Sequence, residues 1–258
     1  MAIKEGQRKW VLFLAMFIFF VLAYTVARSS SAVADEVGGH LTSGHLYWQS
    51  GQFSGGINNF PLGQLLLAFP LWLLGETHEA FSEENLLLFR FPAIFMGVLL
   101  VYLVYYLARQ LFDEETGLLA ALLCCCSPNL VTHFSLACLD GPLAFFCFAT
   151  ICALYAYLKG PSLRRASLLG LSLGCALATK IQAFFLLPLI VIGLVVYALD
   201  KETKSFPYSP WQLLLICLIP FLVINACYLH LPIGRGSFLP PLYVKALSAK
   251  LTHGLSKA

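Results

Sequence analysis

The sequence predicts an all-α fold, a polytopic membrane helical bundle of about seven transmembrane helices with an interfacial helix in the first external loop. Two observations support this class. The 258 residues are 59% hydrophobic and 11% charged, whereas about a quarter of the residues in an ordinary soluble domain are charged. The basic residues form short clusters beside long apolar runs, as topology signals do.

The first apolar run, residues 10–27, follows the basic residues Lys4, Arg8 and Lys9. No small-residue cleavage site leads from it into a soluble domain, so we expect a signal anchor with a cytoplasmic N-terminus. The further crossings are expected at residues 86–112, 117–136, 141–158, 166–179, 183–199 and 211–231. The run at 166–179 is short for a crossing.

Another apolar segment, residues 61–75, has fifteen residues, fewer than the roughly twenty that a helix needs to cross the membrane. If it does not cross, Arg109, Lys159 and Lys201 all lie in the cytoplasm, as the positive-inside rule requires. If it crossed, Lys159 would lie outside. We therefore expect a helix on the outer interface, within a first external loop at residues 28–85.

The chain is expected to form one transmembrane module, residues 1–231, followed by an external or interfacial tail, residues 232–258. The tail is either a native end or the point where a longer parent has been cut. All nine cysteines lie in or at the ends of apolar runs, which indicates small buried hydrophobes rather than disulfides or metal ligands. The net charge of +3 is too small to suggest a nucleic-acid partner.

Acids, histidines and glycines concentrate at residues 33–62, in the first external loop. Asp35 and Glu36 come eight residues after the first apolar run closes, so their carboxylates lie at the lipid boundary, where idle charge is costly. One alternative is that both are solvated loop acids. Polar neighbours favour a functional site, and we take three of them as candidate substrate-binding residues: His40, Tyr47 and Asn59.

Three more charged residues fall at the predicted outer ends of apolar runs. Asp140 precedes a Gly-Pro pair that starts a helix, where an aspartate can cap the helix and also line a site. Arg90 and Lys180 could simply extend to the headgroups. Positive charge is not the topological preference on the outer face, however, and a basic residue there can hold a phosphate. Asp35, Glu36, Asp140 and Lys180 are expected to converge on that face.

The order of these features resembles the membrane glycosyltransferases of the GT-C superfamily, in particular the protein O-mannosyltransferase and aminoarabinose-transferase branch. The resemblance runs from about residue 10 to residue 199 and rests on five motifs in order. These are the acidic pair Asp35-Glu36, a helix start at Asn58-Asn59-Phe60-Pro61-Leu62-Gly63, an Arg-x-Pro span with Arg90, Pro92 and Gly97, the helix start Asp140-Gly141-Pro142-Leu143, and a Gly-x-x-x-Gly helix ending in Thr-Lys with Gly170, Gly174, Thr179 and Lys180.

The resemblance implies an inverting glycosyltransferase that moves a sugar from a polyprenyl-phosphate donor to an acceptor hydroxyl on the outer face. Asp35 by preference, or Glu36, would act as the base. Lys180 or Arg90 would stabilise the leaving phosphate. Asp140 would orient the acceptor or the base, or would share a divalent cation with Glu36; no other cofactor is implied.

The alternative to catalysis is a non-catalytic scaffold subunit of a larger membrane complex. Family members usually continue through more helices, and the Pro-Pro pair is reduced here to Phe60-Pro61, which favours the scaffold. A transporter should show internal symmetry or mid-membrane charges, and neither is seen. The expected partners are membrane lipid, the lipid-linked sugar and other membrane subunits. The expected location is the bacterial inner (plasma) membrane, as a multi-pass protein.

Overall fold

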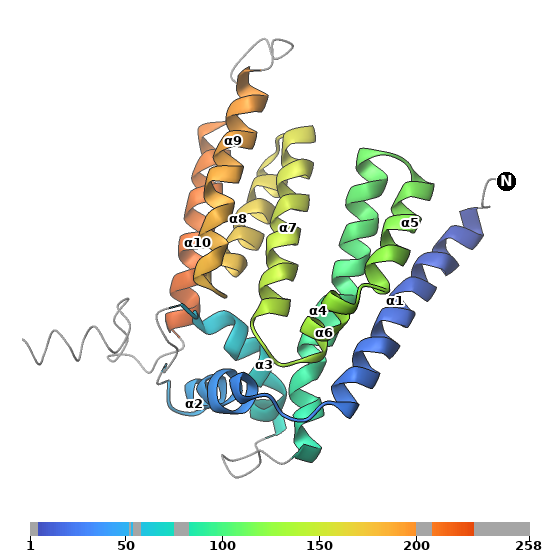
Figure 1. Cartoon of the computed structure of the whole chain (residues 1–258). Coiled ribbons are helices and arrows are strands. Elements are labelled where there is room, and N and C mark those ends of the chain that lie inside the picture. The colour runs from blue at the N-terminus through green and yellow to red at the C-terminus, as the bar shows by residue number, and fades with distance from the viewer. Residues whose placement is uncertain (1–4, 52, 54–57, 75–82, 200–207, 230–258) are drawn as a thin grey trace, which may run out of the picture.

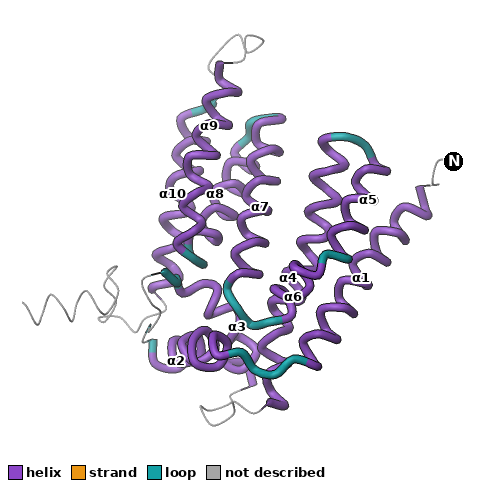
Figure 2. Tube along the Cα trace, in the orientation of Figure 1, coloured by secondary structure: helices purple, strands orange, loops and turns teal. Residues whose placement is uncertain are grey.

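The computed structural model describes residues 5–51, 53, 58–74, 83–199 and 208–229. Within them the regular structure is helical, apart from one isolated antiparallel bridge between Asn59 and Lys180. Figures 1 and 2 show long helices side by side, with shorter helices across one end of the bundle. The predicted all-α membrane bundle is confirmed, whereas the predicted tail at 232–258 lies outside the described residues.

The long helices of the bundle are α1 (Glu5–Ser29), α4 (Glu83–Leu111), α7 (Asp140–Lys159) and α10 (Pro210–Leu229), together with α9 (Leu186–Leu199), which continues a 3₁₀ turn, η3 (Ile181–Phe185). The shorter elements are the π-helix η1 (Asp35–Leu41) and the α-helices α2 (Thr42–Ser50), α3 (Pro61–Leu74), α5 (Glu114–Cys125), α6 (Pro128–Ser135) and α8 (Leu163–Leu177).

The predicted number of seven crossings is not confirmed. In the described part of the chain, five helices are long and apolar enough to cross a membrane, and a sixth is counted if α5 and α6 form one span bent by 60°. The bend falls at Pro128, which lacks a backbone donor and begins a new helix at its first turn. The predicted crossing at 166–179 corresponds to α8, whose 15 residues are too few.

Helix α3, by contrast, agrees with the expectation of an interfacial helix. It has 14 residues with Pro70 inside, too few to cross a bilayer, and it packs against η1, α2 and α4 at one end of the bundle. Trp48 of α2 donates from its indole nitrogen to the Leu65 carbonyl at 2.9 Å and stacks on Trp72, with ring centroids 4.7 Å apart. Indole rings of this kind suit a membrane interface.

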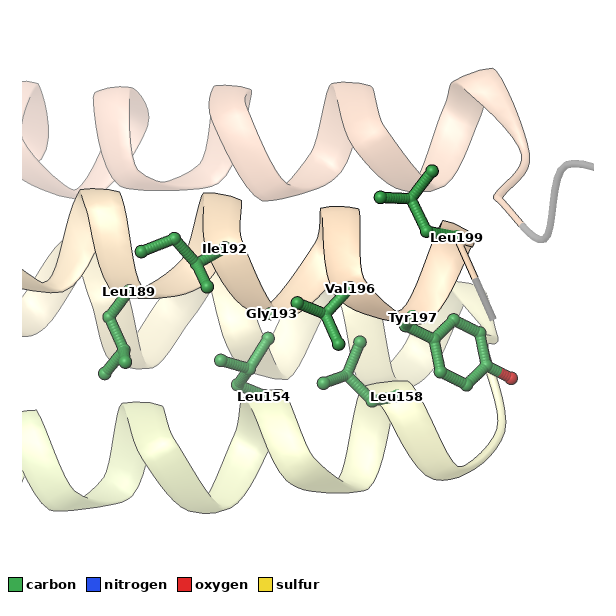
Figure 3. Close-up of a pocket in the computed structure, with 8 residues that line it drawn as sticks. All are labelled: Leu154, Leu158, Leu189, Ile192, Gly193, Val196, Tyr197 and Leu199. Carbon is green, nitrogen blue, oxygen red and sulfur yellow. The ribbon is translucent and has the colours of Figure 1, made fainter. Parts of the chain in front are cut away.

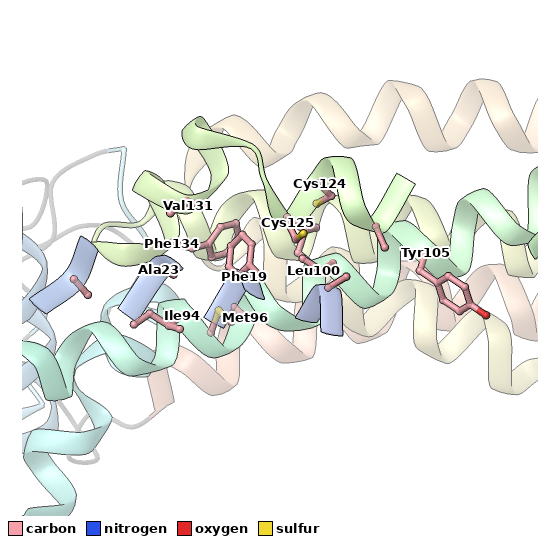
Figure 4. Packing of buried hydrophobic residues seen from close by; sticks show 14 of the residues in the cluster. Phe19, Ala23, Ile94, Met96, Leu100, Tyr105, Cys124, Cys125, Val131 and Phe134 are labelled. Carbon is pink, nitrogen blue, oxygen red and sulfur yellow. The ribbon is translucent and has the colours of Figure 1, made fainter. Parts of the chain in front are cut away.

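Two apolar clusters hold the bundle together, one among α1, α4, α5 and α6 and the other among α7 to α10. In the first cluster, Phe19 and Phe134 meet edge to face at 6.0 Å over Gly97 (Figure 4). A Cβ at Gly97 would lie 2.4 Å from the Phe19 ring, so only glycine allows this approach. In the second cluster, Cβ atoms at Gly170 and Gly174 would lie 2.8 Å from the α10 backbone, which explains this Gly-x-x-x-Gly pattern.

A cavity of about 690 Å³ lies between α7 and α9 (Figure 3). Its lining is aliphatic except for Tyr197, and it includes Leu154 and Leu158 from the C-terminal half of α7. Asp140 lies at the other end of α7, so this cavity is separate from the predicted polar site.

Candidate functional site

The predicted site residues lie at one end of the bundle. Figure 1 shows that α1 ends, α7 begins and α8 ends there, with η1 and α3 beside them. Asp35 and Asp140 are the first residues of η1 and α7, and Lys180 follows α8 closely. The α4–α5 turn, which Arg109 precedes, lies at the opposite end, together with the start of α1.

A buried ion pair anchors the loop that follows α1. The Arg90 Nε donates to Glu36 Oε1 at 2.8 Å, and one terminal nitrogen donates to Glu36 Oε2 at 2.6 Å. The other Arg90 donors reach the backbone carbonyls of Ala27, Ser30 and Ser31. All five N–H groups of this fully buried guanidinium are thereby occupied. Arg90 therefore has no donor left for the phosphate ligand role that the sequence suggested.

Glu36 is also held by backbone groups from two other segments. Its carboxylate accepts from the Ala137 N–H at 2.6 Å, in the turn before α7, and from the Val33 N–H at 3.0 Å. Burial raises the pKa of Glu36, but the hydrogen bonds from Arg90, Ala137 and Val33 outweigh it and lower the pKa overall. With its oxygens occupied, Glu36 is poorly suited to be the base or a cation ligand. Asp35, its exposed neighbour, is the better candidate for the base.

A second ion pair lies at the same end of the bundle. The Lys180 ammonium lies 2.6 Å from Asp140 Oδ1, with the Lys180 and Asp140 side chains 19% and 50% exposed. Leu139, not Asp140, occupies the N-cap position of α7, and its side chain makes no capping hydrogen bond. The capping alternative for Asp140 is therefore not what the structure has. Two residues that are 40 positions apart in sequence meet here through their side chains.

The backbone of Lys180 is fixed by a short strand-like pairing. The Ile181 N–H donates to the Asn58 carbonyl at 3.0 Å, and the Phe60 N–H donates to the Thr179 carbonyl at 3.1 Å. Lys180 itself is extended and forms the bridge with Asn59. Asn59, predicted to bind substrate, thus has a clear positioning role through its backbone. A lysine held this way is directed by the fold, unlike one that simply extends to the headgroups.

His40 connects Asp35 to the second pair. It lies five residues after Asp35 in the π-helix η1, a single turn of the kind that often marks a functional site. Burial lowers the pKa of His40, the carboxylates of Asp35 and Asp140 oppose the shift, and the Lys180 ammonium adds to it. Its Nδ1 atom is buried and has no hydrogen-bond partner among the described residues.

The thiol of Cys138 reports the same convergence of acids. Its pKa is raised to about 12, first by burial and then by the carboxylates of Glu36, Asp35 and Asp140. Because such influence weakens with distance, the three acids lie around one point near the start of α7. The thiol itself stays protonated and is not a nucleophile.

Tyr47, predicted to bind substrate, is fully buried and contacts α10 instead. Its hydroxyl donates to the Cys227 carbonyl, and its ring meets Phe53 edge to face at 5.6 Å. Burial raises the pKa of Tyr47. The side chain therefore joins α2 to the end of α10, which is a structural contact.

Sequence reasoning did not single out Gln64, which carries the only amide in α3. Its side chain is 2% exposed, and its Oε1 atom has no hydrogen-bond partner within the described residues. A Cβ on the preceding residue, Gly63, would lie 2.5 Å from Leu139 and 3.0 Å from Thr179, next to Asp140 and Lys180. A lone amide in an apolar helix was the available signal.

The described residues contain no group of three or more His, Cys, Asp or Glu side chains arranged to hold a metal ion. The predicted sharing of a divalent cation by Asp140 and Glu36 would need oxygens that Glu36 gives to Arg90, Ala137 and Val33. The donor set at this end of the bundle does not fit a cation.

The family model for dolichyl-phosphate-mannose-protein mannosyltransferase matches residues 68–224, more than half of the chain. The chain belongs to this family. The match includes Arg90, Asp140 and Lys180 but begins after Asp35. Membership and the apolar helices make the chain an integral multi-pass membrane protein, and the predicted GT-C resemblance is confirmed at the level of the family.

In structure the chain is similar to the S. cerevisiae protein O-mannosyltransferase Pmt1-Pmt2 complex bound to the sugar donor, with a TM-score of 0.71 and 21% identity. The likeness covers 89% of this chain and 34% of that one, so this chain spans about a third of the relative's length. At this identity the likeness concerns the fold. A search among curated proteins gave no match.

Proposed function

We propose that this chain transfers a sugar from a polyprenyl-phosphate donor to an acceptor hydroxyl at the outer membrane surface. The observation that carries the proposal is the half-exposed Asp140–Lys180 pair, close to the exposed Asp35, in a chain of this family. The buried Glu36–Arg90 pair keeps the loop with Asp35 next to the start of α7.

In the proposed reaction the acceptor oxygen attacks the anomeric carbon of the sugar as the bond from that carbon to the phosphate oxygen breaks. Asp35 takes the proton from the attacking hydroxyl, as a positioned general base does. Lys180 meets the charge that develops on the leaving lipid phosphate. Asp140 keeps the ammonium in place and gives it up to the phosphate, whose double charge competes better for it.

The family name indicates dolichyl-phosphate mannose as the donor class and a protein hydroxyl as the acceptor class. The relative's title names a complex of two subunits, which supports a further membrane subunit as a partner here. The basic residues before the first apolar run favour a cytoplasmic N-terminus, and the bacterial inner membrane remains the predicted location.

A non-catalytic scaffold subunit is the second candidate, and one observation favours it. The chain spans 34% of the relative's length, so the surface that would bind an acceptor has to come from another chain or another segment. A scaffold needs the buried Glu36–Arg90 pair but gains little from an exposed one.

Asp35→Asn tests the proposal, with Glu115→Gln, an exposed acid at the opposite end, as the matched control. Membranes holding each variant would be given dolichyl-phosphate mannose and a peptide hydroxyl acceptor, and transferred mannose would be measured. Losing a general base should reduce transfer about 10²–10⁴-fold and leave the unfolding midpoint unchanged. Equal transfer by Asp35→Asn and wild type would reject Asp35 as the base. If the wild type has no activity even with its membrane partners, the scaffold is favoured.

A further inference from the structure

A polar cavity of about 510 Å³ lies at the opposite end of the bundle from the candidate site. It is formed where α1 starts, α4 ends and α5 begins, and its lining is Arg8, Lys9, Tyr102, Tyr105, Arg109 and Glu114. The proposed glycosyl transfer uses none of these residues.

The charge in this cavity is unbalanced. Glu114, the only acid of the lining, is already paired, because Arg109 Nε lies 2.8 Å from one of its oxygens and the Tyr105 hydroxyl donates to the other at 2.5 Å. Arg8 and Lys9 add two cations with no second carboxylate in the lining. The cavity is therefore suited to an anion.

Arg109 is held in a position from which it can bind that anion. One of its terminal nitrogens donates to the Tyr105 hydroxyl at 3.3 Å, and its guanidinium carbon lies 5.9 Å from the Tyr105 ring centroid. Its other terminal nitrogen makes no hydrogen bond within the described residues. Figure 4 shows the Tyr105 hydroxyl directed away from the apolar cluster, toward this end of the bundle. A fixed guanidinium with free N–H groups recognises phosphate well.

The neighbouring residues put the cavity at the level of lipid headgroups. Trp10, next to Lys9, is 72% exposed, and Phe112 is 73% exposed just after α4. Aromatic side chains in such positions are typical of the membrane–water interface. Below Trp10, Phe13 and Phe17 are 60% and 52% exposed along α1, an apolar face for an acyl chain.

We propose that this cavity binds the phosphate headgroup of an anionic phospholipid, with the acyl chains along the exposed face of α1. Basic pockets between transmembrane helices are known to take such headgroups. The aromatic level and the apolar face favour a membrane lipid over a free phosphate. The site is independent of the proposed glycosyl transfer and of which side of the membrane this end faces.

The test is native mass spectrometry of the full chain in detergent, titrated with phosphatidylglycerol, with phosphatidylcholine or with inorganic phosphate. Wild type should retain phosphatidylglycerol in preference to phosphatidylcholine. The variant Arg8→Gln/Lys9→Gln should bind it more weakly, about five-fold for each cation removed. Arg164→Gln, an exposed cation at the same end but outside the cavity lining, is the matched control and should bind like wild type.

Lys9→Gln alone keeps the proposal testable if the double variant does not fold, since Lys9 is exposed. Equal retention of the two lipids would overturn the proposal, and so would an equal loss in Arg164→Gln, which would indicate non-specific surface charge. If inorganic phosphate displaces phosphatidylglycerol completely at similar concentration, the site belongs to a soluble anion instead of a lipid.

Discussion

The two ion pairs at the same end of the bundle differ in almost every physical respect. The Glu36–Arg90 pair is 0–1% exposed, joined by two hydrogen bonds and completed by five more to backbone groups. The Asp140–Lys180 pair has one hydrogen bond, and half of the Asp140 side chain is exposed. The first pair cannot accept another ligand without breaking, whereas the second can exchange a partner at little cost.

This difference assigns separate tasks to residues that look alike in sequence. Both pairs join an acid and a cation at the outer ends of predicted crossings. A buried pair is costly to desolvate, so nearly every donor and acceptor must be matched, and the result is a rigid joint. An exposed pair contributes about 0–1 kcal/mol, so its position is better explained by what it binds.

The largest expected effect comes from breaking the buried pair. Arg90→Gln should lower the free energy of unfolding by about 3–5 kcal/mol, because it leaves the Glu36 carboxylate buried without its cation. The measurement is the unfolding midpoint of the purified protein in detergent. Arg28→Gln, an exposed arginine in the last turn of α1, is the control and should change little.

The comparison between the pairs would break if Arg90→Gln cost less than about 1 kcal/mol, the range of surface pairs. It would then follow that the seven hydrogen bonds around Glu36 and Arg90 do not act as a joint.

The second prediction concerns the exposed pair and is reversed in character. Lys180→Gln should reduce sugar transfer about 10²–10³-fold, as removal of one charge-stabilising group does, and should change stability by no more than about 1 kcal/mol. Transfer and unfolding midpoint would be measured on the same preparation. Lys180→Arg, which keeps the charge, should recover part of the activity. A large loss of stability with unchanged transfer per folded molecule would make this pair structural as well.

Several features of the fold could be predicted from the sequence because they depend on composition and local pattern. The apolar runs and the positive-inside rule gave the bundle and the surface helix α3, and Gly97, Gly170 and Gly174 lie where helices approach closely. The break at Pro128 and the short α8 were harder, because hydropathy measures the apolar character of a segment but not where its helix ends.

The site was predictable in place but not in detail. Its charged residues do gather at one end, yet the sequence could not say that Arg90 is saturated by Glu36 and three carbonyls. Nor could it give the pairing of Asn58 and Phe60 with residues near Lys180, because no local pattern specifies which distant backbone groups will meet. Burial and partner choice are properties of the assembled fold.

The smallest expected effect is a pH dependence from His40, which feels the charges of Asp35, Lys180, Asp140 and Glu36. Burial holds the pKa of His40 below its ordinary value of 6.5, so the unfolded chain binds a proton more readily than the folded one. Stability should therefore fall as the pH drops below 6.5 toward the lowered pKa of the folded state. Glu36, whose pKa is also lowered, adds its own loss only below its ordinary value of 4.5.

The two windows separate the histidine from the buried acid. Unfolding midpoints of His40→Gln should decline less than those of wild type between pH 6.5 and 4.5, and then fall in parallel with them below pH 4.5. His133→Gln, an exposed histidine of α6, is the control and should follow wild type throughout. If His40→Gln and wild type decline equally above pH 4.5, the acid sensitivity belongs to another group and His40 does not sense the charges around Asp140 and Lys180.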